Sequence, residues 1–232
     1  MHTRLQPIHI YCLHHICASF CADSMHSEDW MDIEYFKLRI SALRKQGVIF
    51  ISLSAAYQKL QEDYIRLNKY AVLTFDDGYA SLHEILPWLI QQNIPATLFI
   101  NPDYASGKAY RETPKETYLS IEEIENYVAN SYGLIEVGMH GSQHKDVTTM
   151  SENEFIDFAT KSIAATSKIN GFIPFWAYTW GRHTAMTDRI LQANNIIPVL
   201  MDGMKNYSNA NIIHRELLLV DIDDINNSIG MN

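Results

Sequence analysis

The sequence predicts an α/β fold built from parallel strands and crossover helices. Along the 232 residues, short apolar runs alternate with segments whose apolar side chains recur at helical spacing. Such alternation is typical of βαβ units, and enough repeats of this unit can close as a barrel. With 47% hydrophobic and 19% charged residues, the chain is long enough for one sizeable core. We therefore expect residues 1–232 to form a single domain.

The first third of the chain predicts two strand–helix pairs. Residues 8–13 are an apolar, strand-like run, and Asp32 precedes a helical pattern that ends at Gly47. Asp32 suits the start of a helix, and glycine suits its end. We expect a strand over 48–53 and a second helix over 54–62.

The middle of the chain contains further strand and helix patterns. Residues 81–92 have helical spacing, with a kink expected at Pro87, and residues 96–100 form a short β-rich run. We expect a loop over 101–117 that could act as a lid or rim. Ser120 and Ser151, each followed three positions later by glutamate, predict capping boxes at the starts of two helices.

Residues 71–75 form an apolar run that delivers two adjacent carboxylates, Asp76 and Asp77, into a turn at Gly78. The run suits a buried parallel strand, and in α/β folds ligands collect where such strands end. One carboxylate could hold a metal while the other takes a proton. Taken alone, Asp-Asp-Gly is also typical of a solvated turn.

A second apolar run, residues 135–139, ends in two histidines four positions apart, His140 and His144. Two neutral imidazoles with one carboxylate, leaving positions open for water, are the ligands of hydrolytic zinc centres and of related transition-metal centres. A histidine pair alone is a weak indication. The two runs together predict a divalent-metal site.

Motifs in chain order resemble the polysaccharide deacetylase family, which is also called the NodB-homology domain or carbohydrate esterase family 4. Residues 74–79 are similar to the first family motif, and residues 140–144 to the second, with Gly141 in the place of Ser or Thr. The resemblance covers nearly the whole chain and is greatest to the exopolysaccharide deacetylase branch. The other stretches that carry it are residues 13–15, 47–53, 94–99 and 175–181.

This resemblance implies a distorted (β/α) barrel of about seven parallel strands. It also implies that Asp77, His140 and His144 bind the metal and that Asp76 is the general base. The implied activity is removal of N-acetyl groups from an amino sugar, in a surface polysaccharide or in its lipid-linked or nucleotide-linked precursor. Zinc is the expected metal by ligand type, with iron, cobalt, nickel or manganese as alternatives.

Two departures from the family pattern keep other functions open. Many members have an arginine that orients the base where this chain has Ala177, and a proline where it has Thr179. Arg215 could supply the positive charge that Ala177 cannot. The alternatives are a deformylase that acts on a lipid-linked amino sugar, and a carbohydrate-binding domain that retains the metal but has lost turnover.

Further residues are expected to complete the site. His214 is the candidate catalytic acid, because it lies near the end of a C-terminal strand-like run, with a protonated Asp76 or His183 as the alternatives. Tyr178 and Trp180 could stack on a sugar ring, although aromatic side chains in a strand also suit a core. The resemblance implies that a backbone N–H after Tyr79 helps to hold an oxyanion.

The start of the chain contains two histidines and all three cysteines. His14 and His15 follow the first apolar run and are expected to lie at the same strand ends as the carboxylates, with His15 as a substrate contact. The odd number of cysteines, Cys12, Cys17 and Cys21, excludes a complete set of intrachain disulfides and suggests a reducing compartment. A second metal site formed by these cysteines and histidines stays open, although the spacing fits no ordinary paired zinc knuckle.

Charge and hydropathy exclude some classes of partner. The formal net charge of −9 argues against nucleic acid and anionic membrane surfaces. No apolar run approaches the length of a membrane span, and residues 1–7 lack the apolar segment of a secretory signal. We therefore expect a cytoplasmic protein whose partner is an N-acetylated carbohydrate. The sequence does not predict the oligomeric state.

Overall fold

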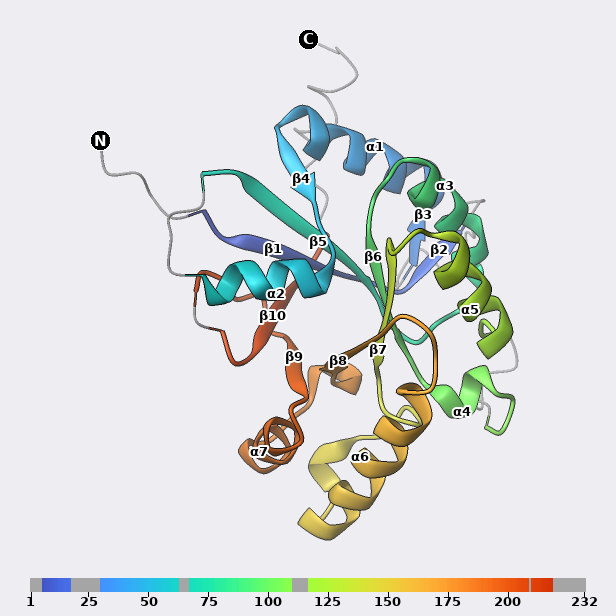
Figure 1. Cartoon of the computed structure of the whole chain (residues 1–232), viewed down its shortest axis with the longest axis vertical. Helices are drawn as coiled ribbons and strands as arrows, with labels where there is room; N and C mark the ends of the chain where they lie inside the picture. The colour runs from blue at the N-terminus through green and yellow to red at the C-terminus, as the bar shows by residue number, and fades with distance from the viewer. Residues whose placement is uncertain (1–5, 18–29, 63–66, 110–116, 209, 219–232) are drawn as a thin grey trace.

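Parallel strands form a barrel at the centre of the fold (Figure 1). The computed structural model describes residues 6–17, 30–62, 67–109, 117–208 and 210–218. Among these residues, seven strands close into a barrel because β1 pairs with both β10 and β5. The predicted (β/α) barrel of about seven parallel strands is confirmed. In spatial order the strands are β1 (Ile8–Leu13), β10 (Ile213–Leu217), β9 (Ile197–Met201), β8 (Phe172–Ala177), β7 (Ile135–Met139), β6 (Ala96–Ile100) and β5 (Lys69–Phe75).

The end of the barrel at which the strands begin is covered by a helix. A short strand, β4 (Val48–Phe50), pairs with the first residues of β5, whereas β6 pairs with the last ones. The chain then enters α2 (Leu53–Gln61). The buried side of α2 packs in one apolar cluster with residues near the starts of the barrel strands, among them Ile8, Ile173 and Ile213. This end is filled by side chains, so a site is expected at the opposite end.

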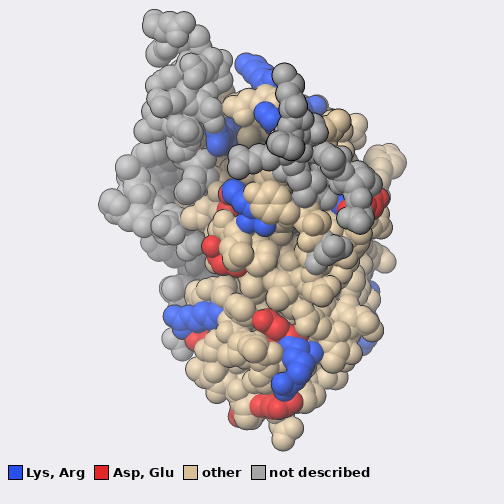
Figure 2. All heavy atoms as spheres, turned by 90° about the vertical axis from the view of Figure 1, so that its left-hand side faces the viewer, with Lys and Arg blue, Asp and Glu red and all other residues tan. Residues whose placement is uncertain are grey.

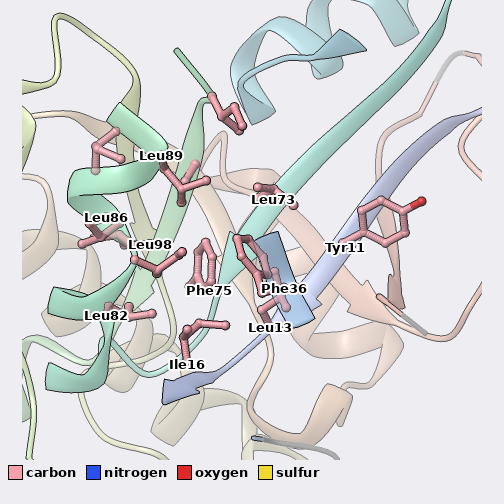
Figure 3. Packing of buried hydrophobic residues seen from close by; sticks show 14 of the residues in the cluster. Tyr11, Leu13, Ile16, Phe36, Leu73, Phe75, Leu82, Leu86, Leu89 and Leu98 are labelled. Carbon is pink, nitrogen blue, oxygen red and sulfur yellow. The ribbon is translucent and has the colours of Figure 1, made fainter. Parts of the chain in front are cut away.

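Apolar side chains hold the outer helices on the barrel. One cluster packs α1 (Ile33–Lys45), α3 (Leu86–Gln91) and α5 (Ile121–Asn130) onto the outward side of the strands. In Figure 3, Phe36 of α1 and Phe75 of β5 lie together at the centre of this packing, with ring centroids 6.2 Å apart. Because Phe75 directly precedes the two aspartates, this packing also fixes the end of β5.

A second group of helices covers the later strands. An apolar cluster that includes Trp176 and Phe155 packs α6 (Glu152–Thr166) and α7 (Ala185–Ala193) against β7, β8 and β9. Trp176 is 1% exposed, and the rings of Phe155 and Phe158 meet it edge-on. This packing anchors β8, whose end carries part of the cavity described below.

Three predicted helix starts are confirmed. The Asp32 side chain accepts a hydrogen bond from the backbone N–H of Tyr35, which satisfies an otherwise unpaired donor of α1. Ser120 and Ser151 form reciprocal capping boxes with Glu123 and Glu154, at the starts of α5 and α6. The starts of these three helices are therefore encoded locally.

Two predicted elements have different bounds. The helix expected over 81–92 is a 3₁₀ turn, η2 (Ala80–Glu84), followed by the separate helix α3. Pro87 lies in the first turn of α3 and does not kink a longer helix, because a residue without an N–H fits where no intrahelical acceptor is needed. The strand expected over 48–53 ends at Phe50, and α2 begins at Leu53.

The loop expected over 101–117 contains one short helix, α4 (Pro102–Ala105), and its residues 110–116 lie outside the described part of the chain, as does Cys21. A small parallel pair, β2 (His15–Cys17) and β3 (Trp30–Asp32), follows β1. Within the described ranges, no helix is both long and apolar enough to cross a membrane. On the face in Figure 2, lysine and arginine side chains are interspersed with acidic ones outside the grey regions.

Candidate active site

The carboxyl ends of the barrel strands surround a cavity of about 340 Å³. Successive side chains on a strand face opposite sides, so a strand contributes every second residue to the barrel interior. Cys12 and His14 come from β1 and its end, and Arg215 comes from β10. In addition to His14 and Arg215, seven residues expected from the sequence line the cavity, namely Asp76, Asp77, Tyr79, His140, His144, Tyr178 and Trp180. His15 and His214 do not line it.

Asp77, His140 and His144 converge in one wall of the cavity. Oδ1 of Asp77 lies 3.6 Å from Nε2 of His140 and 3.6 Å from Nε2 of His144. Around a tetrahedral zinc ion with bonds of about 2.0–2.1 Å, oxygen and nitrogen ligands are roughly 3.3 Å apart. The three donor atoms lie within 4.8 Å of one another, so this group can hold a divalent metal ion after a small contraction.

The backbone of β8 orients His140 for this task. Nδ1 of His140 lies 2.8 Å from the carbonyl oxygen of Ala177. A carbonyl only accepts, so Nδ1 carries the proton and the lone pair of Nε2 faces Asp77. An outer hydrogen bond of this kind is what metal-binding histidines commonly have. Asn101, which follows β6, donates to the carbonyl of His140 at 2.6 Å and fixes the same loop.

Unusual backbone conformations bring the ligands together. Asp77 has a φ of 68°, a left-handed conformation that few residue types other than glycine and Asn or Asp adopt readily. Gly141, between the two histidines, has a φ of 78°, and a Cβ there would lie 2.9 Å from the Phe158 ring. This close approach accounts for the glycine at a position where the family motif has Ser or Thr.

Asp76 is buried and ion-paired with Arg215. Nη1 and Nη2 of Arg215 donate to the two carboxylate oxygens at 2.6 and 2.8 Å, and both residues are at most 2% exposed. Burial by itself raises the pKa of the Asp76 carboxyl, but the Arg215 guanidinium holds that pKa below its ordinary value. Asp76 is therefore an ionised hydrogen-bond acceptor at neutral pH.

Arg215 reaches Asp76 from a different strand than the family arginine. Ala177, at the family position, carries no charge, and Arg215 comes from β10 instead of β8. Its guanidinium also donates to Thr74 at 3.0 Å and lies 5.2 Å from the centroid of the Phe99 ring. The suggestion that Arg215 replaces the missing positive charge agrees with these contacts.

His214 lies on the other side of β10 from Arg215. Its Nδ1 is 2.8 Å from a carboxylate oxygen of Asp202, and its backbone N–H donates to Asn206. Strand alternation explains the separation, because inward Arg215 requires outward His214. His183 pairs with Asp188 and does not line the cavity either. The geometry therefore does not support the expected role of His214 as an acid at this site.

Two histidines near the start of the chain have different positions. His14 lines the cavity, and its electrostatic interaction with the Asp76 carboxylate contributes to the low pKa of Asp76. His15 is 5% exposed and is sandwiched between the rings of Trp30 and Tyr79, at centroid distances of 3.8 and 3.6 Å. His15 therefore supports Tyr79 from behind, and the expected substrate contact through His15 is not in the cavity wall.

The aromatic residues after β8 form the rim. Trp180 is 59% exposed, has a φ of 54°, and meets the ring of His144 edge-on at 4.3 Å. Tyr178 is buried, and its hydroxyl donates to Asp188 at 2.9 Å. The Thr179 hydroxyl donates to the backbone carbonyl of Lys145, the residue after His144. Threonine at this position thus ties the β8 end to the histidine loop.

Cys12 also lines the cavity, although it was expected only as part of an open second metal site with the neighbouring cysteines and histidines. Its Sγ lies 3.6 Å from Oδ2 of Asp76. The signal was available in the sequence, because Cys12 and His14 are two positions apart on one strand and so share a face. Their spacing could have placed both beside the carboxylates.

Comparison with solved structures shows the same fold. IcaB from Ammonifex degensii has a TM-score of 0.77 and 24% identity over 98% of this chain and 98% of that chain. The Streptococcus pyogenes deacetylase PplD in complex with acetate has a TM-score of 0.80 and 17% identity over 99% and 100% of the two chains. A de-N-acetylase from Aggregatibacter actinomycetemcomitans has a TM-score of 0.77 and 13% identity over 96% and 100%.

Sequence comparison identifies the family. No curated protein sequence matches the chain. The family model for polysaccharide deacetylase matches residues 65–198, which include Asp76 and all three residues of the ligand group, Asp77, His140 and His144. The chain belongs to the polysaccharide deacetylase family.

Proposed function

We propose that this protein is a metal-dependent hydrolase that removes N-acetyl groups from an amino sugar in a surface polysaccharide or its precursor. One observation supports this most directly: an ionised, arginine-held carboxylate, Asp76, lies in the same cavity as the Asp77, His140 and His144 group. A deacetylase needs a proton acceptor beside an electrophilic centre. We further propose that residues 1–232 act as one catalytic domain.

Asp77, His140 and His144 would hold the metal. The donor set and the proton on Nδ1 of His140 fit a divalent cation, with zinc favoured by ligand type. Such a cation would polarise the amide carbonyl and lower the pKa of a nearby water molecule. The two histidines would supply two nitrogen ligands and the aspartate one oxygen ligand. Further coordination positions would then stay open for substrate and water.

Asp76 is proposed to take the proton from the attacking water. Its carboxylate stays ionised beside Arg215, and two hydrogen bonds from one planar guanidinium fix its orientation. Arg215 thus acts as a positioning residue. A base with a pKa far below neutral is a weak one, so the Arg215 pair favours the right geometry and ionisation at some cost in basicity.

His14 is proposed to give the proton to the leaving amine. It lines the cavity on the β1 side, next to Asp76. Water attack on the amide carbon, followed by cleavage of the C–N bond, yields acetate and a free amine. Proton delivery to the amine nitrogen makes that cleavage feasible. His14 takes this role in place of His214, because His214 faces Asp202 outside the cavity.

The exposed aromatic residue at the rim of the cavity supports a sugar as the substrate. Exposed Trp180 offers an aromatic face beside His144, and such faces suit the C–H groups of a sugar ring. The similar Streptococcus pyogenes deacetylase was solved in complex with acetate, the product expected here. We therefore propose an acetamido sugar with its ring on Trp180 and its acetyl group in the cavity.

The test is an assay for metal content and product release. Purified protein is incubated with N-acetylglucosamine oligomers and with a lipid-linked or nucleotide-linked acetamido sugar, and acetate is measured. Acetate release that is lost in Asp76→Asn, with metal content retained, supports the proposal. Formate release from an N-formyl sugar without acetate release would favour a deformylase. Metal binding without either product would favour a binding domain.

A matched histidine pair tests the proton donor. His14→Gln should lower turnover by about 10²–10⁴-fold, the usual contribution of a general acid, whereas His214→Gln should leave turnover within a few fold. Thermal unfolding of both variants controls for misfolding. A large loss in His214→Gln with no loss in His14→Gln would reverse the assignment.

A further inference from the structure

A second group of metal-ligating atoms lines the same cavity as the first. Sγ of Cys12, a ring nitrogen of His14 and a carboxylate oxygen of Asp76 all lie within 4.8 Å of one another. None of the three belongs to the Asp77, His140 and His144 group. A thiol, an imidazole and a carboxylate form a donor set that binds zinc and softer divalent ions.

The distance between Cys12 and Asp76 suits tetrahedral coordination. Sγ of Cys12 lies 3.6 Å from Oδ2 of Asp76. With metal–sulfur and metal–oxygen bonds of about 2.3 and 2.0 Å at tetrahedral angles, two such ligands are roughly 3.5 Å apart. Cys12 and His14 share a face of β1 and its end, so the strand itself presents sulfur and nitrogen together.

We propose that Cys12, His14 and Asp76 form a second site, for a thiophilic divalent cation such as Cd²⁺ or excess Zn²⁺, and that its occupation stops turnover. The thiolate and imidazole supply the selectivity for soft cations. The inhibition rests on the proposed function, because a cation there engages both the proposed base and the proposed proton donor. The binding itself does not depend on that function.

Arg215 limits the affinity of this site. Its guanidinium holds both oxygens of Asp76, so a cation on Oδ2 leaves only the second oxygen to Arg215. Binding also releases one proton from the Cys12 thiol to the buffer, and burial raises the pKa of that thiol. Both costs make the second site weaker than one built from Asp77, His140 and His144.

The test uses cadmium and the thiolate-to-cadmium charge-transfer band in the ultraviolet. The chain has three cysteines, and a Cys17→Ser, Cys21→Ser background leaves Cys12 as the sole thiol. Cys17 is a suitable control, because its Sγ donates to the Met31 carbonyl outside the cavity. Cadmium at the first site gives no such band, since that site has no sulfur.

The expected result is a saturable band in the background variant, with one cadmium ion per protein accounting for the band. Cadmium should also raise the melting temperature of this variant. Adding Cys12→Ser should remove the band, and adding His14→Gln should weaken cadmium binding at least tenfold while leaving the thiol in place. Circular dichroism checks that each variant is folded.

Three results would overturn the proposal: no band in the folded background variant at saturating cadmium, a band that survives Cys12→Ser, or a band whose affinity ignores His14→Gln. Inhibition gives a separate readout. Excess cadmium should inhibit the zinc-loaded background variant, and inhibition equal in the Cys12→Ser variant would refute the link to turnover. A protein with the band but no deacetylase activity would overturn the proposed function and leave the second site standing.

Discussion

Replacing Arg215 by methionine tests the ion pair on which the proposed base depends. The substitution keeps most of the side-chain volume but leaves the Asp76 carboxyl buried, at 2% exposure, without its partner. Breaking a buried pair by removing one partner costs about 3–5 kcal/mol. We expect Arg215→Met to lose this much unfolding free energy at neutral pH, which is a large share of the stability of an ordinary domain.

The pH dependence of this loss has a definite sign. In the native protein the pKa of Asp76 lies below its unfolded value of about 3.9, so its contribution is present above that value and lost as pH falls through the folded pKa. Without Arg215, burial dominates and the folded pKa rises above the unfolded one. The destabilisation should therefore grow as pH rises from about 4 to 7.

Urea unfolding of chelator-treated protein at pH 4.5 and 7 measures both effects. Asp76→Asn in the Arg215→Met background removes the buried charge, so the double variant should regain part of the lost stability. Arg182→Met is the matched control, because Arg182 pairs with Asp146 at the surface and such pairs contribute at most about 1 kcal/mol. Equal losses in Arg215→Met and Arg182→Met, or a loss independent of pH, would refute the reasoning. Acetate release should also fall, by roughly tenfold for each unit by which the raised pKa exceeds the assay pH.

Three other predictions concern packing, substrate and metal. Gly138→Ala would place a Cβ 2.4 Å from the Phe99 ring, and we expect a loss of about 1–3 kcal/mol in urea unfolding; no loss would show that the ring moves freely. Trp180→Ala should raise KM for the sugar with little change in melting temperature. Tyr207→Ala, at an exposed aromatic residue outside the cavity wall, should leave KM unchanged, and equal KM values for both would refute stacking on Trp180. Chelation should lower the melting temperature, since a ligand at 100 times its Kd stabilises by about 2.7 kcal/mol; His140→Ala should be insensitive to chelator.

Much of the fold and the proposed ligand group could be predicted because their signals are local. Asp76 and Asp77 directly follow a buried apolar run, and His140 follows another, so the strands deliver them to one end of the barrel. Capping boxes are encoded within four residues, as Ser120 and Ser151 illustrate. Each of these needs only the sequence around it.

Other features depend on which side of a strand a residue faces. His214 and Arg215 are neighbours in one run, and a shift of one residue exchanges which of them enters the barrel. The pairing of Tyr11 with Glu216 fixes the register of β10, and no local pattern encodes it. Pro87 is a similar case, because only the break at Ile85 places it in the first turn of a separate helix.

The Asp76–Arg215 pair joins residues 139 positions apart, and it forms across the seam at which the barrel closes. β1 lies between them, paired with β5 on one side and β10 on the other. An arginine on β8, at the position of Ala177, would serve the base without this closure. In this chain the base obtains its partner only when β10 pairs with β1, so orientation of Asp76 depends on the last strand of the barrel. A variant that weakens the β1–β10 pairing should therefore lose turnover before it loses the metal ligands, which lie on β5 and β7 and their loops.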